Sequence, residues 1–120
     1  MMNDDIAERL GEMEVKRNRT LADLEAVQAA VESVRRSMRA HRSHQYEINA
    51  RFIDQLESDS LPEADRPRLY HEWNEAFKAS IDEYNRLAGE RERLAMQEVV
   101  LVRILAELDH QIEMLKKALS

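Results

Sequence analysis

The histidines are the side chains of this sequence best suited to binding a metal. His41 and His44 lie three residues apart and Glu47 continues the spacing, so a helix would place all three on one face. Metal sites in helical bundles, however, combine Glu-x-x-His pairs from two helices with further carboxylates. His71 and His110 are isolated in the sequence and complete no such set. We therefore expect no metal site.

Other catalytic patterns are also missing from the sequence. Gly11 and Gly89 are the only glycines and stand alone, so no glycine-rich loop can hold a phosphate group. Cysteine is absent, and no serine or lysine has a recognisable nucleophile context. We expect no catalytic residue, no cofactor and no small-molecule substrate, and we interpret the protein as non-enzymatic.

A basic stretch without any acidic residue lies between Ser33 and Tyr46. It could bind an acidic protein surface or phosphate groups. The alternative, which we favour, is neutralisation by acids of a second helix, since exposed ion pairs are common and individually weak. Those acids are Asp82, Glu83, Glu90 and Glu92. The basic residues, here named the arginine cluster, are Arg35, Arg36, Arg39 and Arg42.

The stretch from Val99 to Leu105 is apolar nearly all round a helix. A two-stranded coiled coil would bury only Leu101 and Leu105 of this stretch. Helices that are apolar on further sides are normally buried on more than one side, so we expect a second copy or another protein to cover the remainder. The residues concerned, here named the valine surface, are Val99, Val100, Val102, Ile104 and, across the seam, Leu21.

The helices that carry these residues are predicted from a repeat of mainly apolar positions, which are spaced alternately four and three residues apart. This spacing predicts two long helices with a continuous coiled-coil seam. The first seam comprises Ile6, Leu10, Met13, Arg17, Thr20, Leu24, Val27, Val31, Val34, Met38, His41, Gln45, Ile48 and Phe52. The second comprises Trp73, Phe77, Ser80, Tyr84, Leu87, Arg91, Leu94, Glu98, Leu101, Leu105, Leu108, Ile112, Leu115 and Leu119.

The two seams match when the chain is folded between them. In antiparallel order Phe52 meets Trp73 at one end and Ile6 meets Leu119 at the other, with no seam position left over. The sequence thus predicts an all-α, long antiparallel two-helix coiled-coil hairpin, with two hairpins able to pair as a four-helix bundle. Several seam positions are polar: their side chains either extend out of the narrow seam or fix its register. They are Arg17, His41, Gln45, Arg91 and Glu98.

Pro62 and Pro67 mark the turn, because proline disrupts a helix interior. We expect one hairpin over residues 1–120, with helices at about 4–57 and 67–119 and a turn at about 58–66. Ser60 and Glu63 have the spacing of a capping box, and Asp65 is a second candidate helix cap.

The composition indicates where the protein is located and which kinds of partner it binds. Charged residues make up 35% of the chain and the net charge is −6, without a basic tail, which argues against nucleic acid as a partner. The start Met-Met-Asn-Asp-Asp lacks the basic residues of a signal peptide, and no apolar run reaches the length of a membrane span. We expect a cytoplasmic protein that binds protein partners or forms a homodimer.

The residues Arg-Leu-Ala-Gly-Glu-Arg-Glu-Arg-Leu at positions 86–94, with Trp73 upstream and the two-helix plan, resemble the central stalk proteins of type III secretion and flagellar export. Those helical hairpins insert into a hexameric ATPase ring, so the resemblance implies a stalk-like element of a secretion ATPase complex. A second resemblance, to the N-terminal hairpin of inhibitor-of-growth chromatin proteins, lies in Leu94-Ala95-Met96-Gln97 and Leu108-Asp109. It implies a dimerisation module of a larger complex associated with chromatin or nucleic acid.

We therefore interpret the protein as a coiled-coil interaction or assembly component. The stalk-like role is the first specific form of this hypothesis, and the chromatin- or nucleic-acid-associated module is the alternative.

Overall fold

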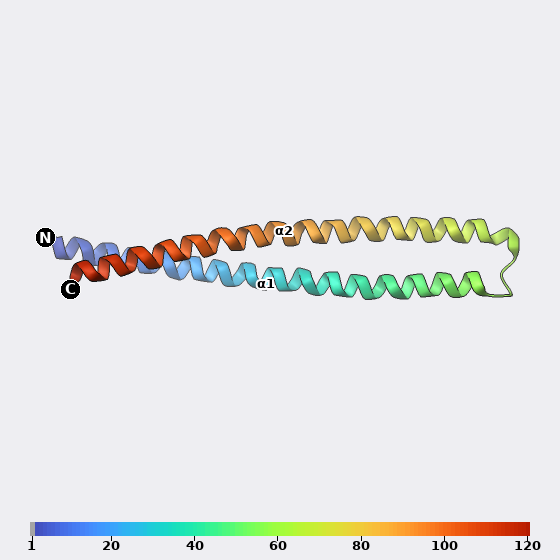
Figure 1. The fold of residues 1–120 in the computed structure, drawn as a ribbon, viewed down its shortest axis with the longest axis horizontal. Helices are drawn as coiled ribbons and strands as arrows, with labels where there is room; N and C mark the ends of the chain where they lie inside the picture. Colours follow the sequence, from blue (N-terminus) through green and yellow to red (C-terminus); the bar gives the residue numbers. More distant parts are fainter. Residues whose placement is uncertain (1) are drawn as a thin grey trace. The chain divides into compact units, whose positions relative to one another are not determined.

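Two long helices account for nearly all of the chain. The computed structural model describes residues 2–120. Helix α1 spans Met2–Glu57, a short 3-10 helix η1 spans Glu63–Asp65, and helix α2 spans Arg66–Leu119 (Figure 1). No strand occurs within residues 2–120. The all-α helical hairpin expected from the sequence is confirmed.

The chain divides into two compact units. The first joins the part of α1 up to Glu32 with Glu92–Ser120, and the second is Ser33–Arg91. Within each unit a segment of α1 lies antiparallel to a segment of α2 (Figure 1). The turn belongs to the second unit, and the start of α1 and the end of α2 belong to the first.

The seam forms the core of both units. All fourteen expected seam positions of α1 are buried or half-buried. The first unit buries Leu24, Val31, Leu94, Leu108 and Ile112, and the second buries Val34, Met38, Leu69 and Leu87. In α2, four expected seam positions are exposed instead: Phe77, Tyr84, Arg91 and Leu119.

Leu69 lies outside the expected seam, which we began at Trp73. It comes four residues before Trp73, and Leu56 comes four residues after Phe52. Leu69 is 8% exposed and Leu56 is half-buried. The seam therefore continues by one further position on each helix before the turn, with a spacing of four where the alternation calls for three.

The turn is built by backbone hydrogen bonds and one arginine. Asp65 N–H donates to the Pro62 carbonyl at 3.0 Å, and the Arg66 guanidinium donates to the Leu56 carbonyl in the last turn of α1 at 3.2 Å. The expected capping box of Ser60 and Glu63 does not form. Instead, the Ser60 hydroxyl lies 2.8 Å from that of Ser58, because η1 begins after Pro62 and has no side-chain cap.

Two of the polar seam residues make contacts between the helices. Arg17 pairs with Asp109 of α2 within the first unit. His41 Nε2 lies 3.0 Å from the Ser80 carbonyl oxygen and 2.9 Å from its hydroxyl within the second unit. These bonds connect particular positions of α1 and α2, which favours the interpretation that polar seam residues contribute to register.

Candidate interaction surfaces

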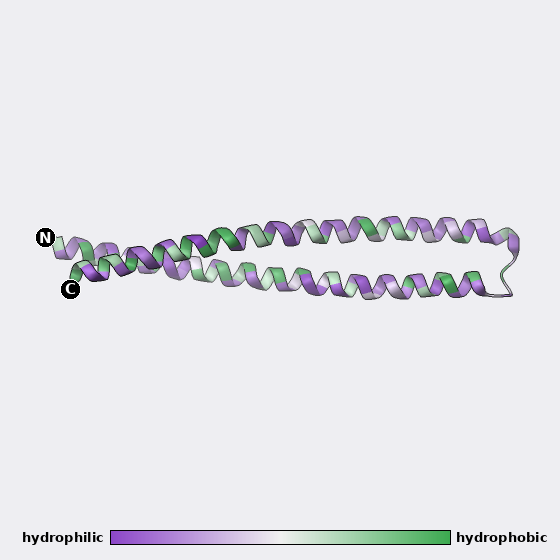
Figure 2. Cartoon of the chain, viewed as in Figure 1, coloured by the Kyte–Doolittle hydropathy of each residue, from purple (hydrophilic) through white to green (hydrophobic). Residues whose placement is uncertain are grey.

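The valine surface lies in the first unit and is open to solvent. Val99, Val100, Val102 and Ile104 are between 43% and 56% exposed, whereas Leu21 is half-buried. Figure 2 shows hydrophobic colouring across this stretch of α2. Aliphatic side chains exposed as a contiguous group usually mark a contact surface.

The valine surface occupies both sides of the seam rather than one. Each residue turns a helix by about 100°, so Val102 and Ile104 fall on opposite sides of the seam residues of α2. Val99 shares the side of Val102, and Val100 shares the side of Ile104. The surface that we expected as one patch therefore consists of two apolar strips.

A shallow groove shows which residues of α1 lie beside each strip of the valine surface. Val100 lines this groove with Met96 and Gln97 of α2 and with Asp23 of α1. Asp23 and Leu21 lie on opposite sides of the α1 seam at the level of Leu24. Leu21 therefore lies on the side of Val99 and Val102.

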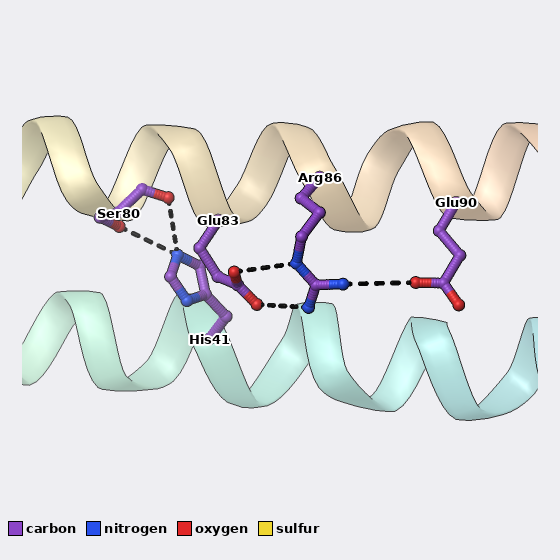
Figure 3. Close-up of polar contacts among 5 residues, drawn as sticks. All are labelled: His41, Ser80, Glu83, Arg86 and Glu90. Carbon is purple, nitrogen blue, oxygen red and sulfur yellow. Dashed lines mark hydrogen bonds and ion pairs between the residues drawn. The ribbon is translucent and has the colours of Figure 1, made fainter.

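The arginine cluster lies on α1 in the second unit, and its expected neutralisation is not seen for three of its members. Within residues 2–120, no ion pair joins Arg35, Arg36 or Arg42 to a carboxylate. Two of the expected acids are engaged elsewhere. Arg86, four residues or fewer from each of them, pairs with Glu83 at 2.7 Å and with Glu90 at 3.6 Å (Figure 3).

The pairing within α2 shifts two pKa values in opposite directions. The hydrogen bonds from Arg86 hold the pKa of Glu83 below its ordinary value, and the charge of His41 contributes in the same direction. The hydrogen bonds that Arg86 donates to Glu83 also raise the pKa of Arg86. Glu83 and Arg86 thus satisfy each other on their own helix, while His41 reaches Ser80 across the seam (Figure 3).

A third surface was not predicted from the sequence. Two adjoining hollows of about 580 and 370 Å³ lie in the second unit and share Asn49 and Phe77. Together they form one groove between α1 and α2. We name it the aromatic groove and define it by Arg42, Tyr46, Trp73, Phe77, Ile81 and Tyr84.

The sequence did contain a signal for this groove. All six aromatic residues of the chain lie between positions 46 and 84, within the second unit. Phe77 and Tyr84 had been counted as seam residues, but they are 47% and 37% exposed. Their large side chains stand at the edge of a seam whose neighbouring positions, such as Gln45 and Ser80, are polar.

Residues 2–120 contain no group of three or more His, Cys, Asp or Glu side chains arranged to hold a metal ion. No helix within the same residues combines the length and apolar character needed to cross a bilayer.

Comparisons with known proteins give no family assignment for the chain. No protein-family model, curated protein or solved structure matches it. Function is therefore inferred from the surfaces described above.

Proposed function

We propose that the protein is a non-enzymatic coiled-coil assembly component of the cytoplasm, which joins a second copy or another protein through the valine surface. The supporting observation is the exposure of four aliphatic side chains on a helix whose seam is already filled. Their exposed fractions, 43–56%, leave about half of each side chain in contact with water.

The free energy available from covering this surface is substantial. Full burial of a Val or Ile side chain is worth roughly 1.5–3 kcal/mol, so hiding the exposed half contributes about 1 kcal/mol per residue. Four such residues give about 4 kcal/mol before the cost of association is subtracted. Two hairpins packed together as a four-helix bundle would cover one strip of each hairpin, and a partner helix would cover the other.

The resemblance to export stalk proteins gives this proposal a specific form. A stalk acts as a stiff rod that presents side chains to an ATPase ring, and the helical hairpin suits that role. The support is the hairpin itself and residues 86–94, in which Arg86 is held by Glu83 and Glu90. Co-purification of a hexameric secretion ATPase with the protein from its native source would support this form of the proposal.

The test changes each strip separately. Val99→Glu with Val102→Glu alters one strip, and Val100→Glu with Ile104→Glu alters the other. Glutamate is a better helix former than valine, so the helix should remain intact. We expect at least one of the double variants to lose the assembled mass measured by light scattering, or to lose protein partners captured from the native source.

Val15→Glu supplies a matched control. Val15 is 54% exposed on α1 in the same unit, but it lies outside the valine surface. We expect this variant to keep the wild-type mass and partners. If both double variants also keep them, the valine surface is ordinary exposed surface and the proposed function is wrong.

A further inference from the structure

The aromatic groove has a rigid floor. Trp73 stacks on Phe52 with ring centroids 5.8 Å apart. Asn49 Oδ1 accepts one hydrogen bond from Trp73 Nε1 and another from Gln45 Nε2, each at 3.0 Å. Side chains from both helices are thereby held in place before any ligand arrives. A preorganised surface of this kind avoids part of the ordering cost of binding.

The walls of the groove are apolar and exposed. Tyr46 is 69% exposed, Phe77 47%, Ile81 42% and Tyr84 37%. Exposed aromatic side chains beside a fixed floor are characteristic of binding hot spots, in which Tyr, Trp and Arg are enriched. The groove runs between two helices, which is the setting in which an amphipathic third helix packs.

The groove is also free of negative charge. None of the described residues that line its two hollows is Asp or Glu, although the chain carries 24 acidic residues and a net charge of −6. The basic side chains that line it are Arg42, His41 and His71. Such a local exception in an acidic protein indicates a partner of opposite charge.

The arginine cluster extends this charge along the same side of α1. Arg35, Arg39, Arg42 and Tyr46 follow one another at spacings of four, three and four, so they form one stripe that leads into the groove. Arg35 and Arg42 have no ion pair within residues 2–120. A ligand in the groove can therefore place acidic side chains along this stripe.

We infer that the aromatic groove docks an amphipathic helix of an acidic partner protein. The apolar face of that helix packs on Phe77, Ile81 and Tyr84, and its acidic edge faces Arg42 and the arginine stripe. The net charge of −6 repels a polyanion, which favours a protein helix over a nucleic acid as the occupant. This site lies in a different unit from the valine surface and does not depend on the proposed function.

The experiment uses the whole chain and synthetic peptides of about 18 residues, or five helical turns. One peptide carries Leu at alternating spacings of three and four with Glu on the remaining face. A second has Lys in place of every Glu, and a third has the composition of the first with the Leu spacing scrambled. Trp73 is the only tryptophan of the chain and lines the groove, so its fluorescence reports binding directly.

We expect the acidic amphipathic peptide to bind saturably and shift the Trp73 emission to shorter wavelength. The Lys peptide and the scrambled peptide should bind at least about tenfold more weakly, because one lacks the charge and the other the apolar face. Arg42→Glu and Ile81→Glu should each weaken binding of the acidic peptide by at least about tenfold. Circular dichroism checks that both variants remain folded.

Arg51→Glu is the matched control for charge. Arg51 is exposed on the same helix and in the same unit but does not line the groove. It should leave binding unchanged, as should Val100→Glu with Ile104→Glu in the other unit. The inference is overturned if no acidic peptide binds saturably, or if Arg51→Glu weakens binding as much as Arg42→Glu. It is also overturned if single-stranded DNA at low salt displaces the peptide in an Arg42-dependent manner, because the groove would then be a nucleic-acid site.

Discussion

Trp73 and Phe52 stack across the hairpin in the second unit, with ring centroids 5.8 Å apart and ring planes inclined by 11°. The indole Nε1 of Trp73 also donates a hydrogen bond to Asn49 of α1. Stacking fixes the separation of the two helices at this level, and the hydrogen bond fixes the orientation of the indole. The pair therefore determines which residues of α1 and α2 face each other near the turn.

Phe52→Ala should lower the free energy of unfolding by about 2–3 kcal/mol. Phe52 is half-buried, so the loss is smaller than for a fully buried Phe but includes the stacking contribution. Tyr46→Ala is the control, since Tyr46 is on the same helix but 69% exposed, and it should cost less than about 1 kcal/mol. Urea denaturation followed by circular dichroism measures both. Equal losses would show that the stacked pair is not a special contact.

Leu69→Ala should cost about 2–3 kcal/mol of unfolding free energy, because Leu69 is only 8% exposed and truncation leaves a cavity in the core of the second unit. Ile53→Ala removes a comparable side chain that is 41% exposed, and it should cost less than about 1 kcal/mol. The same urea titration compares them. A Leu69→Ala variant as stable as Ile53→Ala would mean that the seam ends at Trp73, as we first expected from the sequence.

The contrast between Leu69 and Trp73 shows what a repeat can and cannot predict. The spacing of three and four identified the fourteen seam positions of α1, because burial follows helical phase. Leu69 was missed because it lies four residues before Trp73, whereas the alternation calls for a spacing of three at that point. Proline is tolerated in the first turn of a helix, so α2 begins at Arg66 and the seam reaches Leu69.

The surfaces were harder to predict than the seam. The apolar character of Val99 to Ile104 was evident from composition, but their separation into two strips requires the position of the seam on α2. The aromatic groove was missed because Phe77 and Tyr84 have seam spacing, and spacing alone does not state whether a large ring fits between two helices. The pairing of Arg86 with Glu83 was likewise not expected, because we expected Glu83 to neutralise the arginine cluster of α1.

The Glu83–Arg86 pair should make stability depend on pH in the acid range. Because the pKa of folded Glu83 is lowered below its ordinary value of 4.5, its ionised form favours folding. This contribution is present at neutral pH and is lost as the pH falls through the lowered pKa. Wild type should therefore have a higher Tm than Glu83→Gln at neutral pH, and the difference should disappear in acid.

The control for this prediction removes the partner. In an Arg86→Gln background, Glu83→Gln should no longer change the Tm at neutral pH, because the hydrogen bonds that lower the pKa of Glu83 are gone. Thermal melts at several pH values measure both pairs of variants. A Tm difference that is the same at neutral and acid pH would exclude ionisation of Glu83 as its cause.

The arginine cluster should not bind nucleic acid with submicromolar affinity, even at low salt, where phosphate contacts are strongest. Within residues 2–120, Arg35, Arg36 and Arg42 form no ion pair with a carboxylate, so these three side chains attract anions locally. The duplex phosphate backbone, however, extends well beyond one helical stripe and would meet the acidic residues that give the chain its charge of −6. A short acidic helix fits within the stripe and avoids them. A fluorescence titration with labelled DNA, for wild type and for the cluster changed to Ala, measures the difference. Submicromolar binding that disappears when the cluster is changed to Ala would contradict this prediction and the assignment of the groove to a protein partner.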